Sequence, residues 1–410
     1  MQTKLLSRLS NKPINAHLTV LLLVLWLAGI FLINVLYSAD KTETELVSRV
    51  IATGLEVPWQ IDFAPERRIF ITERHGRVLV FNSQAETASG TLPKPAVWTT
   101  LTNVFERGEG GLLGIAIDPD FATTPYVYLA YNESRNGKPY HQLVRYIEIT
   151  TNINGQSRRV GKLDKVLISN IPGAVFHNGG RLKFAKDKTL FWGIGDRLIP
   201  DSAQNLNVLT GKILRLTREG GIPGNNPFRN SYIYSYGHRN VQGIAFSDKG
   251  DQIFASEHGP SSWNLCCRDE VNEIYAGANY GWPVITGDQT HPKMITPLLH
   301  SGTNITWAPG GLVYVSEGKW AHSLLVTGLR GRSLYRIVLA KQKRSNGKLS
   351  RSRATKLEVY FNDKWGRLRD IAKGNKRYGF SDNYYILTSN RDGRGNPRKD
   401  DDKIILFSLP

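Results

Sequence analysis

The chain has 410 residues, of which 40% are hydrophobic and 10% aromatic, and its formal net charge is +18. This length suffices for a large hydrophobic core, and the 39 glycines together with the aromatic content favour many short strands and turns over long helices. A strongly basic chain can bind nucleic acid, but the sequence has no nucleic-acid recognition motif, and we expect no nucleic-acid partner.

The N-terminal segment predicts a membrane anchor. Lys4, Arg8 and Lys12 precede an uncharged run that extends from Leu18 to Tyr37. About twenty apolar residues are enough to cross the hydrocarbon core of a bilayer, whereas the apolar region of a cleaved signal peptide is usually shorter. Because the basic residues lie before the apolar run, we expect the N-terminus to face the cytoplasm.

A cleaved signal peptide is the alternative for the same segment. A cut after Ala39 would place Tyr37 at the −3 position, where a small residue is expected. We therefore favour an uncleaved signal anchor in residues 1–38, and expect a secreted protein if the segment is removed. Residues 39–410 are then one domain outside the cytoplasm, in the periplasm or at the cell surface.

From about residue 46 onward, short apolar runs recur between turn signals, and no long helical period is present. The runs come in pairs that predict hairpins, and the pairs start near residues 70, 126, 190, 253, 324 and 384. Six strand-rich units of similar length predict an all-β fold, a six-bladed β-propeller. Residues 47–54 are expected to pair with the last unit and close the ring. A large β-sandwich is the alternative fold, but it suits units of this length poorly.

The segment 177–197, HNGGRLKFAKDKTLFWGIGDR, pairs a histidine with an aspartate. Its apolar run 189–194 predicts a buried strand, after which Asp196 would face the loop that carries His177. A carboxylate in that place can fix an imidazole as a general base. A histidine in a loop is more often merely solvated, so the pair alone does not establish catalysis.

Arginines recur beside glycine at the predicted strand ends. Arg239 and Asn240 stand in GHRNVQG, and Arg330 follows Gly328. Arg367 and Arg369 are two residues apart, so they would face the same side of a strand. In a propeller these positions converge at one end of the central channel, where guanidinium groups would make a surface that suits a polyanionic small molecule.

Taken in order, the motifs resemble those of the soluble glucose/sorbosone dehydrogenases that depend on pyrroloquinoline quinone (PQQ), including the aldose sugar dehydrogenases. The resemblance runs from Pro58 to Asp402 and includes PWQIDF, GEGGLLGIAIDPDF, HNGGRLKF, IGDR, YSYGHRNVQGIAF, ASEHGP, NYGWP, RLRD and TSNRDGRGNP. It implies a six-bladed propeller that binds PQQ and calcium. It also implies oxidation of the C1 hydroxyl of an aldose to a lactone, with hydride transfer to PQQ and electrons passed to an external acceptor.

The resemblance further implies roles for individual residues. The implied catalytic residues are His177 as general base, Asp196 as the carboxylate that orients it, and Arg239 as the cation that polarises the quinone carbonyl. The implied cofactor-binding residues are Glu109, Arg239, Asn240, Arg330, Arg367 and Arg369. The implied calcium ligands are the carbonyls of Gly259 and Pro260 for the cofactor's calcium, and Glu270 with the carbonyl of Tyr280 for a second, structural calcium.

The chain departs from the family pattern in places that affect substrate preference more than cofactor class. Glu109 stands where a glutamine is expected, Arg330 where lysine is common, and Phe176 where some relatives have an aspartate. The connection SSWNLCCR is longer than usual and brings Cys266 and Cys267 close to the expected cleft. These cysteines form either a strained disulfide between neighbours or two free thiols.

Two other functions fit a propeller of this kind. One is a binding module that has lost catalysis, which the joint presence of His177, Asp196, Arg239 and Asn240 disfavours. The other is a calcium-dependent lactonase or esterase, which would not require several arginines directed at one cofactor.

Overall fold

The computed structural model describes residues 46–410 except 86–89, 263–264, 341–343 and 346–347. The predicted anchor, residues 1–38, lies outside the described residues. Within the described part of the chain, no helix is long and apolar enough to cross a membrane.

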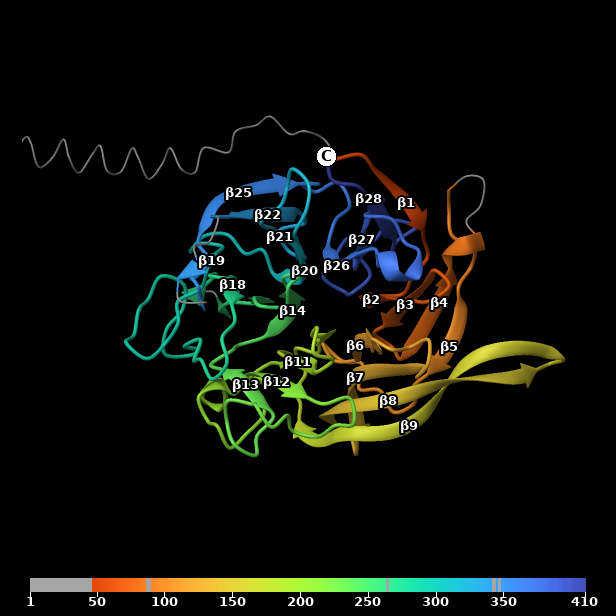
Figure 1. Ribbon diagram of the computed structural model, residues 1–410, viewed down its shortest axis with the longest axis horizontal. Coiled ribbons are helices and arrows are strands. Elements are labelled where there is room, and N and C mark those ends of the chain that lie inside the picture. Colours follow the sequence, from red (N-terminus) through yellow and green to blue (C-terminus); the bar gives the residue numbers. More distant parts are fainter. Residues whose placement is uncertain (1–45, 86–89, 263–264, 341–343, 346–347) are drawn as a thin grey trace, which may run out of the picture. The chain divides into compact units, whose positions relative to one another are not determined.

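Six four-stranded antiparallel sheets are arranged around a common centre, which confirms the predicted six-bladed β-propeller (Figure 1). Blade 1 contains β2 (Pro58–Ala64), β3 (Arg68–Glu73), β4 (Arg77–Asn82) and β5 (Ala96–Thr100). Blade 2 contains β6 (Leu112–Ile117), β7 (Tyr126–Arg135), β8 (Lys138–Ile153) and β9 (Gln156–Pro172). Blade 3 contains β10 (Leu182–Phe184), β11 (Leu190–Ile194), β12 (Lys212–Leu216) and β13 (Ile233–Tyr236).

The remaining blades follow the same plan. Blade 4 contains β14 (Val241–Phe246), β15 (Ile253–Glu257), β18 (Glu270–Glu273) and β19 (Leu299–His300). Blade 5 contains β20 (Pro309–Val315), β21 (Ser323–Gly328), β22 (Leu334–Leu339) and β25 (Ala354–Tyr360). Blade 6 contains β26 (Leu368–Lys373), β27 (Tyr384–Thr388), β28 (Ile404–Phe407) and β1 (Ser48–Ala52).

Short elements occupy some of the connections. Two small hairpins are formed by β16 (Ser261–Ser262) with β17 (Leu265–Cys266) and by β23 (Arg344–Ser345) with β24 (Lys348–Leu349). Single 3-10 turns are η1 (Ser83–Ala85), η2 (Pro200–Ala203) and η3 (Lys376–Tyr378). The β8–β9 hairpin extends outward beyond the other strands of the propeller (Figure 1).

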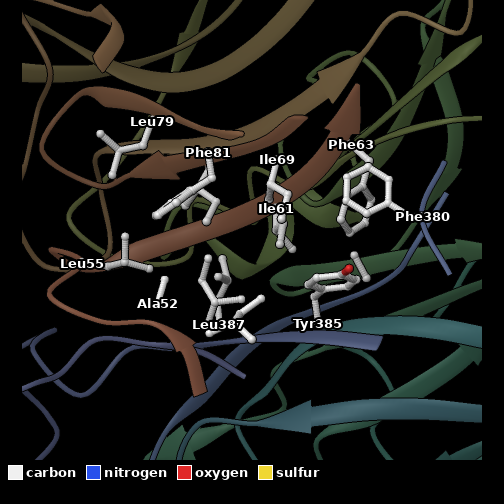
Figure 2. Close-up of a cluster of buried hydrophobic side chains, with 14 residues drawn as sticks. Ala52, Leu55, Ile61, Phe63, Ile69, Leu79, Phe81, Phe380, Tyr385 and Leu387 are labelled. Carbon is white, nitrogen blue, oxygen red and sulfur yellow. The ribbon is translucent and has the colours of Figure 1, made fainter. Parts of the chain in front are cut away.

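The ring closes through β1, as the sequence predicted. β1 pairs antiparallel with β28, with Ser48 opposite Phe407 and Val50 opposite Ile405. A hydrophobic cluster between blades 6 and 1 covers this closure (Figure 2). In it, the Phe63 ring lies 4.7 Å from that of Phe380 and 5.0 Å from that of Tyr385, measured between centroids. The Tyr385 pair is an edge contact, and such aromatic pairs add to the stabilisation from buried area.

The central channel is filled by polar side chains of the inner strands. Arg181, just before β10, forms an ion pair with Asp370 of β26 at 2.9 Å, and both side chains are buried. The guanidinium of Arg181 also lies 4.6 Å from the centre of the Trp59 ring. The other oxygen of Asp370 accepts a hydrogen bond from the amide of Ile61 at 3.0 Å. These contacts join blades 1, 3 and 6 along the axis.

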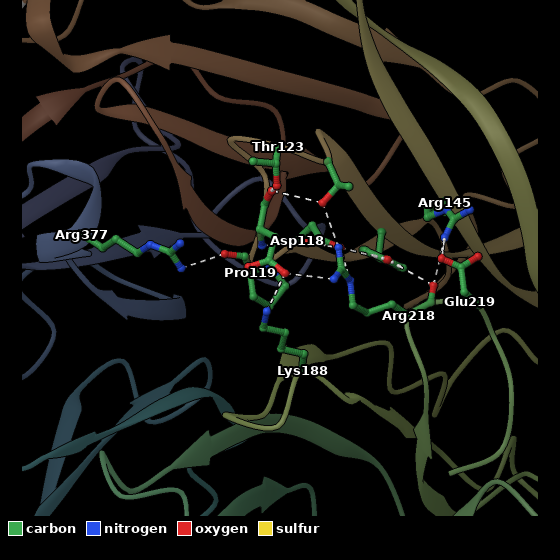
Figure 3. A network of polar contacts seen from close by, with 11 residues as sticks. Asp118, Pro119, Thr123, Arg145, Lys188, Arg218, Glu219 and Arg377 are labelled. Atoms are coloured by element: carbon green, nitrogen blue, oxygen red, sulfur yellow. Dashed lines mark hydrogen bonds and ion pairs between the residues drawn. The ribbon is translucent and has the colours of Figure 1, made fainter.

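A second polar network holds the connections at one end of the propeller together (Figure 3). Arg218, which follows β12, binds both oxygens of the fully buried Asp118 carboxylate at 2.7 and 2.8 Å. Arg377 in η3 donates to the carbonyl of Pro119 at 2.9 Å, and Lys188 pairs with Asp120 at 2.6 Å. The network thus links blades 2, 3 and 6 at the end where the first strand of a blade turns into its second.

Replacing Phe63 with alanine tests the closure. Phe63→Ala is expected to lower the free energy of unfolding by about 3–5 kcal/mol, because it removes a buried ring from the cluster between blades 6 and 1. Denaturant titration of the purified protein measures this. Val47→Ala is the control, since Val47 is 84% exposed, and its change should be within about 0.5 kcal/mol of zero. Equal effects of the two substitutions would contradict the role given to Phe63.

Candidate active site

The strand order decides where the predicted site residues meet. In each blade the chain runs up and down, so its connections alternate between the two ends of the propeller. Connections from one blade to the next include 101–111, 173–181 and 237–240. Connections between the second and third strands of a blade include 195–211 and 389–403. Both kinds emerge at the same end, opposite the network of Asp118, and they carry the candidate site.

A cavity of about 480 Å³, here called the main cavity, opens among these connections. It is lined by seven of the predicted residues: Glu109, His177, Arg239, Gly259, Arg330, Arg367 and Arg369. Asp196 and Asn240 are buried behind it and contact the lining residues. Pro260, Glu270 and Tyr280 are buried in the blade 4 region and do not line the cavity.

His177 is held by the carboxylate that the sequence predicted. Its Nδ1 lies 2.7 Å from Oδ1 of Asp196, a residue that is fully buried. The same oxygen accepts from the amide of Leu198 at 2.9 Å, and Oδ2 accepts from Nε1 of Trp282 at 2.7 Å. Because an ionised carboxylate only accepts hydrogen bonds, Nδ1 carries the proton and the lone pair is on Nε2. His177 is therefore arranged to accept a proton at Nε2.

The backbone around His177 requires glycine at a neighbouring position. His177 itself has a φ of 58°, in the left-handed region. A Cβ on Gly195 would lie 2.1 Å from the carbonyl oxygen of His177, which no side chain could tolerate. The amide of His177 donates to Oε2 of Glu109 at 3.0 Å, and the amide of Gly179 donates to Oδ1 of Asn240 at 3.0 Å. Side chains from two other connections thus fix this loop.

Arg239 enters the main cavity from the start of blade 4. Its guanidinium donates to the carbonyl of His258 and to Oγ of Ser261, each at 3.3 Å, and it lies 5.4 Å from the Trp282 ring centre. Burial lowers the pKa of Arg239, although the surrounding carboxylates oppose the shift. Its Nε is buried and finds no hydrogen-bond partner among the described residues. A buried N–H group without a protein partner, such as this Nε–H, is available to donate to a ligand.

Arg367 and Arg369 share one carboxylate. Arg367 pairs with Asp392 at 2.7 Å, whereas the nearest Arg369 nitrogen is 3.7 Å from Asp392 and another donates to Gln242 at 3.2 Å. Burial lowers the pKa of Arg369 to about 10, and the positive charge of Arg367 acts in the same direction. Its Nε is also buried without a partner in the described structure. One carboxylate therefore compensates two closely placed cations only in part.

The lining as a whole carries surplus positive charge. Six arginines line the main cavity: Arg74, Arg239, Arg330, Arg367, Arg369 and Arg394. Three carboxylates line it: Glu109, Asp269 and Asp392. Buried charges of one sign require a counter-charge, so the cavity fits a ligand that bears several anionic groups. A planar tricarboxylate such as PQQ meets this requirement.

Glu109 connects the base to the far side of the cavity. Its Oε1 pairs with Arg394 at 2.8 Å, while Oε2 accepts from His177 and, at 3.4 Å, from Asn240. Burial alone would raise the pKa of Glu109, but the charges of His258 and Arg394 and the amide of His177 outweigh it and lower the pKa to about 2. Glu109 is therefore an anion throughout the neutral range, with Arg394 as its counter-charge.

Glu270, a predicted calcium ligand, lies beside a second buried carboxyl group, that of Glu257. Burial and the nearby Glu257 carboxylate raise the pKa of Glu270 to about 8. The Asn272 amide donates to both carboxylates, at 2.9 Å to Glu257 and 3.3 Å to Glu270, and its buried Oδ1 has no partner in the described structure. Clustered carboxyl and amide oxygens of this kind fit a hard cation.

No described group of three or more His, Cys, Asp or Glu side chains has the arrangement of a metal site. The calcium sites predicted from the sequence would use the backbone carbonyls of Gly259 and Pro260 at one site, and Glu270 with the backbone carbonyl of Tyr280 at the other. They stay predictions.

The paired cysteines lie against the main cavity, as expected from the long connection. Cys266 and Cys267 form a disulfide, which decides between the two alternatives left open by the sequence. A Cβ on Gly259 would lie 2.1 Å from the carbonyl oxygen of Cys267. The disulfide segment therefore packs directly on Gly259, which lines the cavity.

Sequence reasoning missed several residues that complete the site. Trp282 binds the second oxygen of Asp196, Asp392 pairs with Arg367, and Arg394 pairs with Glu109. These residues stand in the motifs NYGWP and NRDGRGNP. The motifs carried the resemblance, but their individual side chains received no role because their partners are distant in sequence.

Comparison with known proteins adds to this geometry. The model of the glucose/sorbosone dehydrogenase family matches residues 55–397. An aldose sugar dehydrogenase of Escherichia coli is 29% identical, over 84% of this chain and 90% of its own. Quinoprotein glucose dehydrogenase B of Acinetobacter calcoaceticus is 28% identical, over 69% of this chain and 63% of its own.

Two solved structures extend the likeness to three dimensions. An oxidoreductase (glucose dehydrogenase) from Thermus thermophilus has 35% identity and a TM-score of 0.75, covering 88% of this chain and 100% of that one. The PQQ-bound aldose sugar dehydrogenase of Streptomyces coelicolor has 31% identity and a TM-score of 0.72, covering 88% of this chain and 97% of that one. The resemblance inferred from the motifs is confirmed: the chain belongs to the glucose/sorbosone dehydrogenase family.

Proposed function

We propose that this protein is a PQQ- and calcium-dependent dehydrogenase that oxidises the C1 hydroxyl of aldose sugars to lactones and passes the electrons to an external acceptor. The observation that carries the proposal is one cavity that contains both an oriented base, His177, and a surplus of arginine charge. The names of the relatives support the cofactor and the substrate class.

In the proposed reaction, His177 removes the proton of the C1 hydroxyl with Nε2. The imidazolium that results lies against the buried Asp196 carboxylate at 2.7 Å, which stabilises its charge and keeps the ring in place. Trp282 and the Leu198 amide hold that carboxylate in turn. The chemistry that PQQ supplies when bound is the acceptance of hydride by an ortho-quinone.

The cofactor would be held mainly by charge. Arg367, Arg369 and Arg330 can bind its carboxylates, and the unpaired Nε atoms of Arg239 and Arg369 are donors that such a ligand would satisfy. Arg239 is also the cation placed to stabilise negative charge on a quinone oxygen. Asn240 positions the His177 loop through the amide of Gly179.

Calcium completes the proposal at two places. The carbonyls of Gly259 and Pro260 would bind the cofactor's calcium, and Glu270 with the carbonyl of Tyr280 would bind a structural ion. The neighbouring buried side chains of Glu257 and Glu270 support the second site, because a cation there would stabilise the ionised form of Glu270, which burial and Glu257 disfavour.

We also propose that residues 1–38 anchor the protein in a membrane with its propeller outside the cytoplasm. The support is the basic N-terminus followed by the uncharged run from Leu18 to Tyr37. Intact-mass measurement of the protein isolated from membranes should give the full-length mass. A mass that begins near Ala39, found in the soluble fraction, would overturn the anchor and favour a cleaved signal.

Reconstitution tests the activity. The full chain is mixed with PQQ and calcium and assayed with several aldoses and a dye acceptor. His177→Ala is expected to lower turnover by about 100- to 10,000-fold, because the general base is lost, while PQQ binding measured by calorimetry is retained. Arg369→Gln is expected to weaken PQQ binding about tenfold or more through loss of a charge-assisted contact.

His291→Ala is the matched control for the base, since His291 is exposed and does not line the main cavity. Absence of both dye reduction and PQQ binding in the wild-type protein would overturn the proposed function. Wild-type turnover in His177→Ala would show that the base is a different residue.

Calcium binding is tested on the PQQ-free chain by stability. Calcium at a hundredfold excess over its dissociation constant is expected to raise the free energy of unfolding by about 2.7 kcal/mol. Glu270→Gln should remove most of this gain, whereas Glu317→Gln, at a carboxylate 67% exposed, should keep it. A calcium response that survives in Glu270→Gln would place the ion elsewhere.

A further inference from the structure

A second cavity, of about 510 Å³, adjoins the main cavity between blades 5 and 6. We call it the arginine pocket because six of its lining residues are basic: Arg330, Arg332, Arg367, Arg394, Arg398 and Lys403. Arg332, Arg398 and Lys403 do not line the main cavity. The arginine pocket is thus more than a part of the predicted cofactor site.

Among the described residues, two carboxylates line the arginine pocket, those of Asp363 and Asp401, and the basic groups Arg367 and Arg394 pair with Asp392 and Glu109 of the main cavity. Arg332 pairs with Asp363 at 3.2 Å, and Lys403 pairs with Asp401 at 3.3 Å. Arg330 and Arg398 form no ion pair with any described residue, and both are exposed at the cavity. The pocket therefore has positive charge that the described protein does not neutralise.

The arginine pocket is continuous with the site of the proposed reaction. Leu329, Arg330, Arg367 and Arg394 line both cavities. Arg394 is ion-paired with Glu109, whose other oxygen accepts the amide hydrogen of His177. A single ion pair thus separates the wall of the arginine pocket from the loop that carries the base.

The other lining groups suit a sugar. Asn396 is an exposed amide that can bond hydroxyl groups, and Trp365 offers an aromatic side chain. The volume of about 510 Å³ is similar to that of the main cavity and exceeds what a lone inorganic anion needs. The pocket combines room for a sugar unit with excess positive charge.

We propose that the arginine pocket binds an anionic group, a carboxylate or a phosphate, carried by the sugar substrate at a distance from C1. The substrate class is then an acidic aldose, such as an oligosaccharide of hexuronic acids or a sugar phosphate, with its reducing end at His177. Arg398, which lines the arginine pocket and not the main cavity, is the residue that binds the anion. This inference deepens the proposed function and rests on it for the position of C1.

The test uses the full chain saturated with PQQ and calcium, so that the cofactor site is filled. Matched substrates differ in the presence of an acidic group: digalacturonate against galactobiose, and glucose 6-phosphate against glucose. We expect KM about tenfold lower for the acidic member of at least one pair, because charge-assisted hydrogen bonds are gained. The pair in which KM is lower for the acidic sugar shows whether the pocket prefers a carboxylate or a phosphate.

Arg398→Gln is expected to erase this preference, raising the KM ratio of acidic to neutral sugar about tenfold. Lys399→Gln is the matched control: Lys399 is exposed in the same connection and loses the same charge, but it does not line the pocket. Lys399→Gln is expected to keep the lower KM for the acidic sugar. Equal KM values within both pairs, or equal effects of the two substitutions, would overturn the proposal.

Calorimetry separates this inference from the proposed function. Digalacturonate and inorganic phosphate are titrated into the PQQ-treated wild type, Arg398→Gln and Lys399→Gln. Binding that Arg398→Gln weakens, in a protein that oxidises no sugar, would support the anion site and overturn the dehydrogenase. Sugar oxidation without binding of either anion would support the dehydrogenase and overturn the anion site. Inhibition by phosphate that is competitive with the dye acceptor, and not with the sugar, would also overturn the proposal.

Discussion

Closure of the ring through β1 and β28 is the constraint on which the site depends. Because blade 6 lies next to blade 1, its connections reach residues from the first half of the chain. Arg394 pairs with Glu109 across this junction, and Asp370 binds both Arg181 and the amide of Ile61. Ring closure therefore supplies the counter-charge of Glu109, the carboxylate that accepts the amide hydrogen of His177.

The site gathers six arginines at a place where three carboxylates compensate only part of their charge. Arg181 in the channel has Asp370 as a carboxylate partner of its own, whereas Arg367 and Arg369 share Asp392. Removing charged groups from water is costly unless partners replace it. A propeller can bear this cost because its blades supply the stability elsewhere, through clusters such as the one around Phe63. What is left uncompensated is available to ligands.

Much of the fold could be predicted because the second and third strands of each blade are apolar runs separated by turns. β3 and β4, for example, flank the turn at Gly76. The inner strands were not recognised as separate elements. β10 has only three residues, and its identity as a strand depends on pairing with β11. Tertiary context, and no local pattern, determines such an element.

The candidate site was predictable to a similar degree. His177 and Asp196 lie in one segment, joined by the strand β11, so their approach could be inferred from strand geometry. The contact of Trp282 with Asp196 spans 86 residues and that of Arg394 with Glu109 spans 285. No spacing rule reaches over such distances. The sequence likewise left the pairing of Cys266 with Cys267 undecided, because neighbouring thiols are compatible with either state.

During translation β1 is synthesised near the beginning of the chain, and its partner β28 near the end. Ser48 lies opposite Phe407, so blade 6 stays incomplete until nearly the whole chain has been made. Contacts between residues so far apart form late and slowly. Both ends of the described chain belong to this blade, so covalently joining them would not disturb its order. Opening the chain instead at the exposed Asn154–Gly155 turn of the β8–β9 hairpin would give a circular permutant in which blade 6 is continuous and blade 2 is the blade that the two ends of the chain complete.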